Sequence, residues 1–402
     1  MAAEGPSPKR GPGFREAIAL LALMISLVAL SVDTMLPALP DIGRDFGVRH
    51  ANDVQLVVSV LIFGLAIGQL IYGPLSDSTG RKPAIFAAIV IFTLGCLISI
   101  FATCFEGMLV GRFVQGIGAS GPRSVIVALV RDQYGGRAMA RMMSAVMAVF
   151  IIVPAVAPAL GQAILMVANW RSIFVTLMLL GMIALIWFTI RQPETLARER
   201  RRVFSPRKIM MGAVEVCTNR IALGYTLAAG FIMGAFLGYL NSVQQVFQEV
   251  YGLGRQFPLF MAILALFVGG ASYCSSRIVM RVGMRSLSRR AIMLLIVISL
   301  IYLIVVYYMD GHSPFWMLMV CFATIFFCLG ILFGNLNAIA MEPLGHIAGV
   351  GSAVVGSLST LVAVPLGIVI GRSYDGTTMP LVEGFAILSI LAAIAMRWAD
   401  SK

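Results

Sequence analysis

Charged residues are scarce in this chain. Of its 402 residues, only 12% are Asp, Glu, Lys or Arg, whereas 59% are hydrophobic, and the mean hydropathy is +0.94. Soluble domains are about half apolar and about a quarter charged, so the composition excludes an ordinary soluble domain. The apolar runs are roughly 20 residues long, which favours membrane-spanning helices over the ~10-residue alternating strands of a barrel. Because a helix satisfies its own backbone in lipid, we expect an all-α membrane protein.

Cysteine is also scarce, and its placement argues against two kinds of site. The six cysteines form no CxxC pair and lie mostly in apolar runs. We therefore expect small buried side chains, with neither a disulfide framework nor a metal site. A GxxxxGK[ST] phosphate loop is missing as well, so ATP is not expected to drive the protein. No A-x-A cleavage pattern follows the first apolar run, which we interpret as a retained helix. We expect no cofactor and no enzyme activity.

Twelve apolar runs are long enough to cross a hydrocarbon core of about 30 Å. They fall near residues 16–36, 54–75, 84–103, 106–131, 139–167, 171–190, 221–247, 257–281, 288–309, 314–340, 350–372 and 380–398. One long basic segment separates the first six from the last six. We therefore expect six-helix bundles at 1–190 and 221–402, joined by a cytoplasmic loop at 191–220. Paired halves of this kind place a binding site near the bilayer midplane, between the halves.

Lys and Arg are distributed unevenly between the two ends of these runs. If the N-terminus is cytoplasmic, 23 of them lie on the cytoplasmic side and two lie within the fourth run. Only five lie on the outer side: Arg44, Arg49, Arg171, Arg255 and Arg372. Cytoplasmic loops are rich in Lys and Arg, so we expect both termini in the cytoplasm. The same bias accounts for the net charge of +12 without nucleic acid as a partner.

The segment GPLSDSTGRKPAIF joins the second and third runs. Gly73 and Gly80 permit a tight reversal of the chain. Asp77 suits a helix N-terminus, and Arg81 suits the cytoplasmic side. The segment resembles the signature loop of the major facilitator superfamily, although Ser78 stands where the family usually carries Arg. The resemblance implies a 6+6 major facilitator fold; an ordinary basic turn is the alternative.

Asp132, at the cytoplasmic end of the fourth run, lies level with this loop. In the family, the Asp and Arg of the loop join a carboxylate at this place in an ionic latch. The resemblance therefore implies a latch made by Asp77, Arg81 and Asp132. Such a latch would hold the cytoplasmic side closed while the binding site faces outward.

The fourth run contains GRFVQGIGAS, which resembles the R-x-x-Q-G-x-G segment of drug/proton antiporters in the superfamily. Its Arg112 lies about 9 Å inside the outer end of the run. The guanidinium either reaches back to the outer surface or faces water or a carboxylate inside the protein. Arg123 lies eleven residues later, about 20° off the same helix face. The same two alternatives apply to Arg123 at the cytoplasmic end.

The fifth run contains VPAVAPALGQAIL, in which Pro154 and Pro158 each remove a backbone donor and Gly161 allows a neighbour to approach closely. A kinked structural helix is the plain interpretation. The segment is also similar to the helix 5 motif of antiporters in the superfamily, with Ala157 in place of the usual Gly. The segments NWRSIF, PETL, VFQEVYGL and GVGSAVVGSL are similar to the Bcr/CflA branch.

Asp33 is a carboxylate inside the first apolar run, in the stretch SVDTMLPALPDIG. The stretch resembles the DMYLPALP segment that ends the first helix in the Bcr/CflA drug-resistance branch. If the first and fourth helices are neighbours, Asp33 and Arg112 can meet at a central cavity. Burial favours the neutral form of a carboxyl group, whereas a cationic neighbour favours the charged form. The two effects together suit a group that gains and loses a proton under a gradient. The alternative is an interfacial carboxylate in contact with outer water.

Polar and aromatic positions inside the runs are the candidates for substrate contact, because such side chains in a span face protein or water. They are Ser26, Gln115, Tyr239, Gln244 and Asn335. Some of them are expected only to bridge helices. Ser26 stands where some relatives carry a second carboxylate, and the second half has no acidic residue well inside a span. We therefore expect one proton per cycle and neutral or zwitterionic substrates.

These motifs extend over residues 14–398, and the chain is identified as a member of the major facilitator superfamily of the Bcr/CflA type. The resemblance implies proton-coupled export of small, mostly apolar, drug-like compounds such as antibiotics. It also implies a monomer in the bilayer of a bacterial inner membrane. Two alternatives stay open. One is an exporter of a native metabolite, such as a siderophore, sugar or amino-acid derivative, and the other is a sensor that binds without transport.

Overall fold

The computed structural model describes residues 12–201 and 203–401, and all regular elements within them are helical. Twelve long helices correspond one to one with the predicted runs, which confirms the all-α membrane class. They are α1 (Phe14–Asp33), α3 (Leu56–Thr79), α4 (Arg81–Ile100), α5 (Phe105–Gln133), α6 (Gly136–Val167), α7 (Arg171–Arg191), α9 (Arg220–Gln245), α10 (Phe257–Val282), α11 (Met284–Tyr308), α12 (Phe315–Met341), α13 (Ala348–Arg372) and α14 (Met379–Asp400).

Helices α12 and α13 follow each other almost without interruption. By length and composition alone, the described residues hold 11 helical stretches that could cross a membrane, because Phe315–Arg372 forms one stretch of 58 residues. The stretch is broken at Glu342–Ile347, where Leu344 leaves the helical region with φ −103° and ψ 18°. Pro343 removes a backbone donor at this point. The break turns one long stretch into two crossings.

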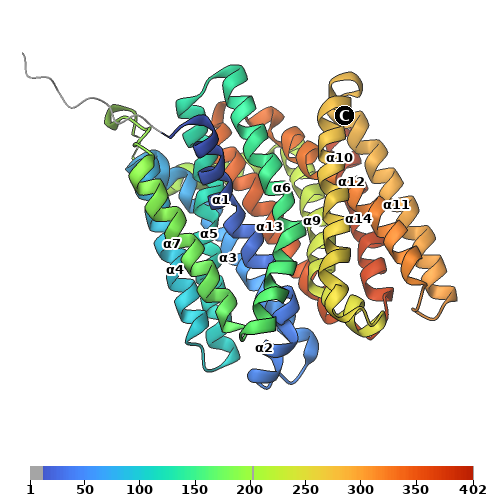
Figure 1. The fold of residues 1–402 in the computed structure, drawn as a ribbon. Helices are drawn as coiled ribbons and strands as arrows, with labels where there is room; N and C mark the ends of the chain where they lie inside the picture. The colour runs from blue at the N-terminus through green and yellow to red at the C-terminus, as the bar shows by residue number, and fades with distance from the viewer. Residues whose placement is uncertain (1–11, 202, 402) are drawn as a thin grey trace, which may run out of the picture.

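The two ends of the described chain lie on the same side of the molecule, as an even number of crossings requires. In Figure 1 the start of α1 and the C-terminus are at the top, and the short helix α2 (Leu39–Asp45) is at the bottom. The distribution of Lys and Arg predicts that the end with the termini faces the cytoplasm. We use "cytoplasmic end" and "outer end" in this predicted sense.

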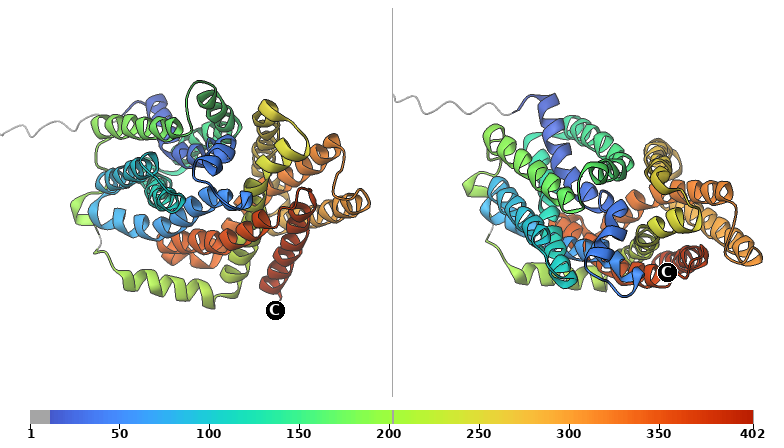
Figure 2. Two further views of the ribbon diagram at one scale, coloured as in Figure 1. Left: turned by 90° about the horizontal axis from the view of Figure 1, so that it is seen from below. Right: turned by 60° about the horizontal axis from the view of Figure 1, so that its bottom comes forward.

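The helices form two groups, shown from two further directions in Figure 2. The first bundle comprises α1 and α3 to α7, and the second bundle comprises α9 to α14. The bundles meet along two helix pairs, α3 with α13 and α6 with α10. Helix α7 ends at Arg191 and α9 begins at Arg220.

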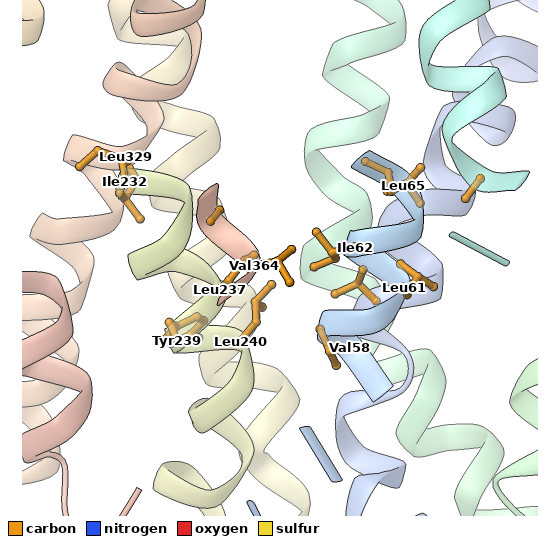
Figure 3. Packing of buried hydrophobic residues seen from close by; sticks show 14 of the residues in the cluster. Val58, Leu61, Ile62, Leu65, Ile232, Leu237, Tyr239, Leu240, Leu329 and Val364 are labelled. Atoms are coloured by element: carbon orange, nitrogen blue, oxygen red, sulfur yellow. The ribbon is translucent and has the colours of Figure 1, made fainter. Parts of the chain in front are cut away.

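An apolar layer fills the contact between the bundles. In Figure 3, Leu237 and Leu240 of α9 and Val364 of α13 point toward Val58 and Ile62 of α3. All five side chains are buried. Burial of such side chains stabilises the arrangement through dispersion and close packing, because lipid offers little hydrophobic driving force between helices.

The connecting segment expected as a loop contains a helix that the sequence pattern did not predict. This helix, α8 (Pro206–Thr218), begins after Ser205, whose hydroxyl accepts the backbone N–H of Lys208. It lies outside both bundles and packs on α13, with Gly212 against Val350. Figure 2 shows it in yellow-green at the edge of the molecule.

Candidate functional site

Asp33 is the last residue of α1, where the chain turns into a 3₁₀ turn (Leu36–Ala38) and then α2. Pro37 and Pro40 follow closely, and residues before proline disfavour helix, which explains why α1 ends here. The side chain of Asp33 is only 6% exposed. Within the described residues, no hydrogen-bond donor or cation pairs with its carboxyl group. Asp33 is therefore a buried acid without a partner.

Helix α6 approaches the chain directly after Asp33. A Cβ atom placed on Gly161 would lie 2.1 Å from the carbonyl oxygen of Thr34 and 3.1 Å from Cγ of Pro37. Only glycine allows this approach. The sequence predicted that a neighbour approaches Gly161 closely, and in the structure this neighbour is the chain at the outer end of α1. Helix α6 remains a single helix through Pro154 and Pro158.

Arg112 of α5 is fully buried inside the first bundle. Its Nη2 donates to the carbonyl oxygen of Ser31 in α1 at 2.8 Å, and its Nε donates to that of Val57 in α3 at 2.9 Å. Its Nη1 donates to Oε1 of Gln115 at 2.7 Å. The guanidinium also lies 5.7 Å from the ring centroid of Phe174. Arg112 therefore ties three helices together and does not reach the outer surface.

Two expectations about this region need correction. The structure does not pair the side chains of Asp33 and Arg112: the guanidinium donates instead to Val57, Gln115 and Ser31 of the first bundle. Gln115 does not line a cavity: it is fully buried, accepts from Arg112 and donates to Sγ of Cys96 at 3.2 Å. Its role in this arrangement is to hold Arg112.

Tyr239 of α9 comes from the opposite bundle and belongs to an aromatic cluster. Its ring centroid lies 4.8 Å from that of Phe326 and 5.8 Å from that of Phe322. Its hydroxyl group is buried without a hydrogen-bond partner among the described residues. The hydroxyl of Ser26 is likewise buried without a partner. Both stay candidates for substrate contact.

The remaining two candidates bridge neighbouring groups. Gln244 donates to Gln248 at 2.7 Å and lines a pocket of about 370 Å³ at the outer end. Asn335 of α12 donates to the hydroxyl of Ser275 in α10 at 3.3 Å. Substrate contact by these side chains stays a prediction.

The three residues of the predicted latch lie together at the cytoplasmic end. Arg81 donates to Oδ2 of Asp132 at 2.9 Å, to Oδ1 of Asp77 at 2.5 Å and to Oγ of Ser76 at 2.8 Å. The Arg81 side chain is only 4% exposed. The cluster thus joins the ends of α3, α4 and α5. Gly73, one turn earlier in α3, lies beside Ala353 of α13 at ordinary packing distance.

Glu194 completes this cluster, although in the sequence it stood out only as part of the PETL segment. Its carboxylate accepts the backbone N–H groups of Arg81 and Lys82, both at 3.0 Å, and so caps α4. A Cβ atom on Gly80 would lie 2.6 Å from Glu194 Oε2, and the φ of Gly80 is +113°. Gly80 is therefore required both for its backbone conformation and for the space it leaves.

Hydrogen bonds between the bundles gather at the outer end. Asn52 donates to the carbonyl oxygens of Arg372 and Tyr374 at 3.0 and 2.8 Å, and it accepts from Gln245 at 2.8 Å. Close by, Arg372 pairs with Asp53 at 2.8 Å, and Asn241 donates to Ser59 at 2.9 Å.

We call this set of residues the outer interlock: Asn52, Asp53, Ser59, Asn241, Gln245 and Arg372. Within residues 12–201 and 203–401, no hydrogen bond or ion pair joins helices of the two bundles at the cytoplasmic end. The arrangement is therefore closed toward the outside.

Comparison with known proteins places the chain in a family. The model of the Major Facilitator Superfamily matches residues 21–368. The chain is 29% identical to an uncharacterized MFS-type transporter, YdgK of Bacillus subtilis, over 95% of this chain and 94% of the relative. It is 27% identical to a bicyclomycin resistance protein homolog of Haemophilus influenzae, over 96% of each chain. It is 30% identical to the multidrug resistance protein MdtL of Klebsiella pneumoniae, over 62% of this chain and 63% of the relative.

Solved structures agree on the fold. The nucleoside transporter NupG superposes with a TM-score of 0.74 at 13% identity, covering 97% of this chain and all of NupG. The xylose transporter XylE of E. coli superposes with a TM-score of 0.70 at 15% identity, covering 95% of this chain and 96% of XylE. At these sequence identities, the structural similarity supports a shared fold and nothing about the substrate.

Proposed function

The chain belongs to the major facilitator superfamily, and on that basis we propose that it exports small, mostly apolar, drug-like compounds in exchange for protons. Members of this family are membrane transporters rather than enzymes. The twelve crossings and the bacterial relatives agree with a multi-pass protein of a bacterial inner membrane. The relatives named for bicyclomycin and multidrug resistance support drugs as the cargo. We further propose that the protein acts as a monomer and needs no cofactor besides the proton gradient.

The observation that carries the proposal is the unpartnered burial of Asp33. An isolated charge in a site of low polarity is costly unless it is paired, so uncompensated burial favours the neutral carboxyl group. Ionisable groups inside the membrane commonly mark ion or substrate pathways. We infer that Asp33 holds its proton in the arrangement closed to the outside. Release of that proton requires a polar environment, which the cytoplasmic solution or a bound substrate can supply.

Arg112 acts in this proposal as a positioning residue. Its bond to the Ser31 carbonyl fixes the last turn of α1, two residues before Asp33. Its bond to the Val57 carbonyl fixes the start of α3, which carries the first-bundle side of the outer interlock. One buried cation thus links the end of the acid-bearing helix to the outer contact between the bundles. Opening of the interlock would bring outer water to Asp33.

The latch and the outer interlock act at opposite ends of the molecule. When the outer interlock opens, the bundles rock, and the latch cluster of Asp77, Arg81 and Asp132 helps to close the cytoplasmic end. In one cycle the protein picks up a proton at Asp33 from outside and releases it inside. The substrate and the proton exclude each other at the site, so that the gradient drives export.

Reconstitution of the purified protein into liposomes tests this proposal. We expect an imposed proton gradient to drive labelled drug-like compounds against their concentration gradient. A broad panel that yields one native metabolite as the only cargo would replace drug export with metabolite export. Binding without any flux would instead identify a sensor and overturn the proposal.

A further inference from the structure

Arg123 of α5 is a charged residue inside the membrane that the proton-coupling arrangement does not use. It lies ten residues from the cytoplasmic end of α5, or about 15 Å along the helix. Arg123 is exposed in the structure, although protein atoms crowd its guanidinium. An exposed residue with protein around its charge fits a recess of the molecule better than the outer rim of a bundle.

Helices α3 and α5 cross, and their crossing leaves one face of α5 without α3 near the cytoplasmic end. Near the middle of the membrane, Gly116 of α5 lies against Leu61 of α3. Nearer the cytoplasm, α3 has moved round α5: a Cβ atom on Gly121 would lie 2.2 Å from Cβ of Ala88 in α4 and 3.3 Å from Cδ1 of Tyr72 in α3. Arg123 is seven residues after Gly116 and therefore about 20° off the same face. At its level, α3 no longer covers that face.

The uncovered face is directed toward the second bundle. Helix α5 packs against α3 and α4 on two sides and against α1 and α6 on another. Helices α3 and α6 make the main contacts with the second bundle, through α13 and α10. A side chain of α5 that emerges between them faces the space between the bundles. This placement also satisfies the rule that charges in a membrane avoid lipid.

Arg123 differs from the two fully buried arginines of this bundle, Arg81 and Arg112. Arg112 and Arg81 each donate three hydrogen bonds. Among the hydrogen bonds and ion pairs of the described residues, Arg123 has none. Its guanidinium fork is therefore available to an external acceptor. Carboxylates match this fork with two parallel hydrogen bonds.

The second bundle supplies an aromatic surface at the same depth. Phe333 lies 18 residues from the outer end of α12, and Arg123 lies 18 residues from the outer end of α5. These helices occupy corresponding places in the two bundles. The ring of Phe333 meets Phe236 of α9 edge to face at 5.7 Å, and Phe236 stacks on Tyr239 at 6.2 Å. The aromatic surface extends from the level of Arg123 toward Asp33.

We propose that Arg123 binds an acidic group of the exported compound on its way from the cytoplasm. The inference rests on the proposed export function and narrows its cargo. The substrates are elongated aromatic zwitterions that place a carboxylate at Arg123 and a cationic or hydrogen-bond-donating end toward Asp33. Arg123 and Arg112 are eleven residues apart, about 16 Å along α5, and Arg112 is level with the end of α1. Allowing for the side chains, the cargo spans roughly 10–15 Å.

The cationic or hydrogen-bond-donating end of such a molecule accounts for the exchange of substrate for a proton. At Asp33 the cationic end and the proton compete for the same carboxyl oxygens, so only one is bound at a time. The acidic end at Arg123 adds affinity without affecting this competition. Arg123 is thus a specificity residue, whereas Asp33 is the coupling residue.

Binding to the purified full-length protein in detergent tests the inference. The probes are norfloxacin, an aromatic compound with a carboxylate at one end and a piperazinium at the other, and its methyl ester. We expect the wild type to bind the acid at least about tenfold more tightly than the ester, because the ester loses a charge-assisted hydrogen-bond pair. Arg123→Ala should abolish this preference by weakening only the acid, and Arg123→Lys should restore part of it.

Arg131→Ala is the matched control, since Arg131 is an exposed arginine of the same helix outside the recess. It should keep the preference for the acid. Equal binding of acid and ester by the wild type would overturn the inference. So would a preference that survives in Arg123→Ala, or an equal loss of both probes in that variant. The export function is tested separately by gradient-driven flux, so its failure is distinguishable from a failure of this inference.

Discussion

The guanidinium of Arg112 donates a 2.8 Å hydrogen bond to the carbonyl oxygen of Ser31, two residues before Asp33, and does not pair with the Asp33 carboxylate. The buried cation therefore fixes the backbone that presents the acid and leaves the acid itself free. This separation suits proton coupling, because a strong ion pair would hold the carboxylate charged throughout the cycle.

Replacement of Arg112 tests its positioning role. Arg112→Ala removes the donor of three buried acceptors, and we expect it to lower the free energy of unfolding by about 3 kcal/mol, since each unsatisfied group costs roughly 1–3 kcal/mol. Thermal unfolding in detergent measures the loss. Arg131→Ala, an exposed arginine of the same helix, should leave stability within about 0.5 kcal/mol of the wild type. Equal stability of the two variants would contradict the role.

The contact of Gly161 with Thr34 gives a second prediction. In Gly161→Ala the added methyl group would meet a backbone oxygen at 2.1 Å, and backbone atoms cannot yield as a side chain does. We expect α6 to move away from the end of α1 and export to fall at least about tenfold, given the steric cost of overpacking of roughly 1–3 kcal/mol. Gly270→Ala is the control, because nothing lies within 4 Å of that position. Vesicle export at matched protein amounts is the measurement, and full export by Gly161→Ala would count against the argument.

The latch residues should control access from the cytoplasm. Arg81→Ala breaks the bonds to Asp77 and Asp132. We expect the cytoplasmic end to stay open for longer, because the ends of α3, α4 and α5 are no longer held together. A cysteine in place of Val127, an exposed position of α5, reports this through its labelling by an impermeant maleimide from the cytoplasmic side.

Arg277→Ala provides the control for the latch experiment. Arg277 lies near the corresponding cytoplasmic end of α10, and its described partner is the Tyr273 hydroxyl of its own helix. Its loss should leave the labelling rate unchanged. A labelling rate that is the same in Arg81→Ala and the wild type would show that the cluster does not govern access.

The outer interlock should resist opening from outside. Asn52→Ala removes two bonds to backbone carbonyls of the second bundle and the bond from Gln245. We expect faster labelling, by about fivefold or more, of a cysteine placed at Val54, which is only 5% exposed and lines the outer-end pocket together with Gln245. The partly exposed pair of Asp53 and Arg372 should contribute less, about 0–1 kcal/mol. Asn169→Ala at the same end is the control, and the prediction is refuted if both variants label alike.

The crossings could be predicted from the sequence, whereas many side-chain partners could not. Runs of apolar residues and the length of a bilayer fix where helices such as α1 and α12 begin and end, within a few residues. The latch residues were implied by the resemblance of the loop to the signature segment of the family, and they lie near the ends of consecutive helices. The partners of Arg112 do not, because backbone carbonyls of α1 and α3 carry no sequence signal. Their position depends on how the helices cross.

Three other features were missed for related reasons. Helix α8 is short and lies in a basic segment, so its two buried positions, Gly212 and Val216, give too little periodicity to recognise. The cap that Glu194 provides for α4 joins residues more than a hundred positions apart. The outer interlock depends on the relative position of the two bundles, which no local pattern contains. Contacts between residues far apart in the sequence, rather than local propensity, determine the cap and the interlock.

Gradient-driven transport by Asp33→Asn tests the central claim most directly. Wild type, Asp33→Asn and Asp41→Asn, an exposed carboxylate of α2 at the same end, are reconstituted into liposomes with an imposed proton gradient. Because the amide cannot take up a proton, we expect Asp33→Asn to carry compounds only down their own gradient, while Asp41→Asn accumulates them as the wild type does. Undiminished uphill transport by Asp33→Asn would contradict the account.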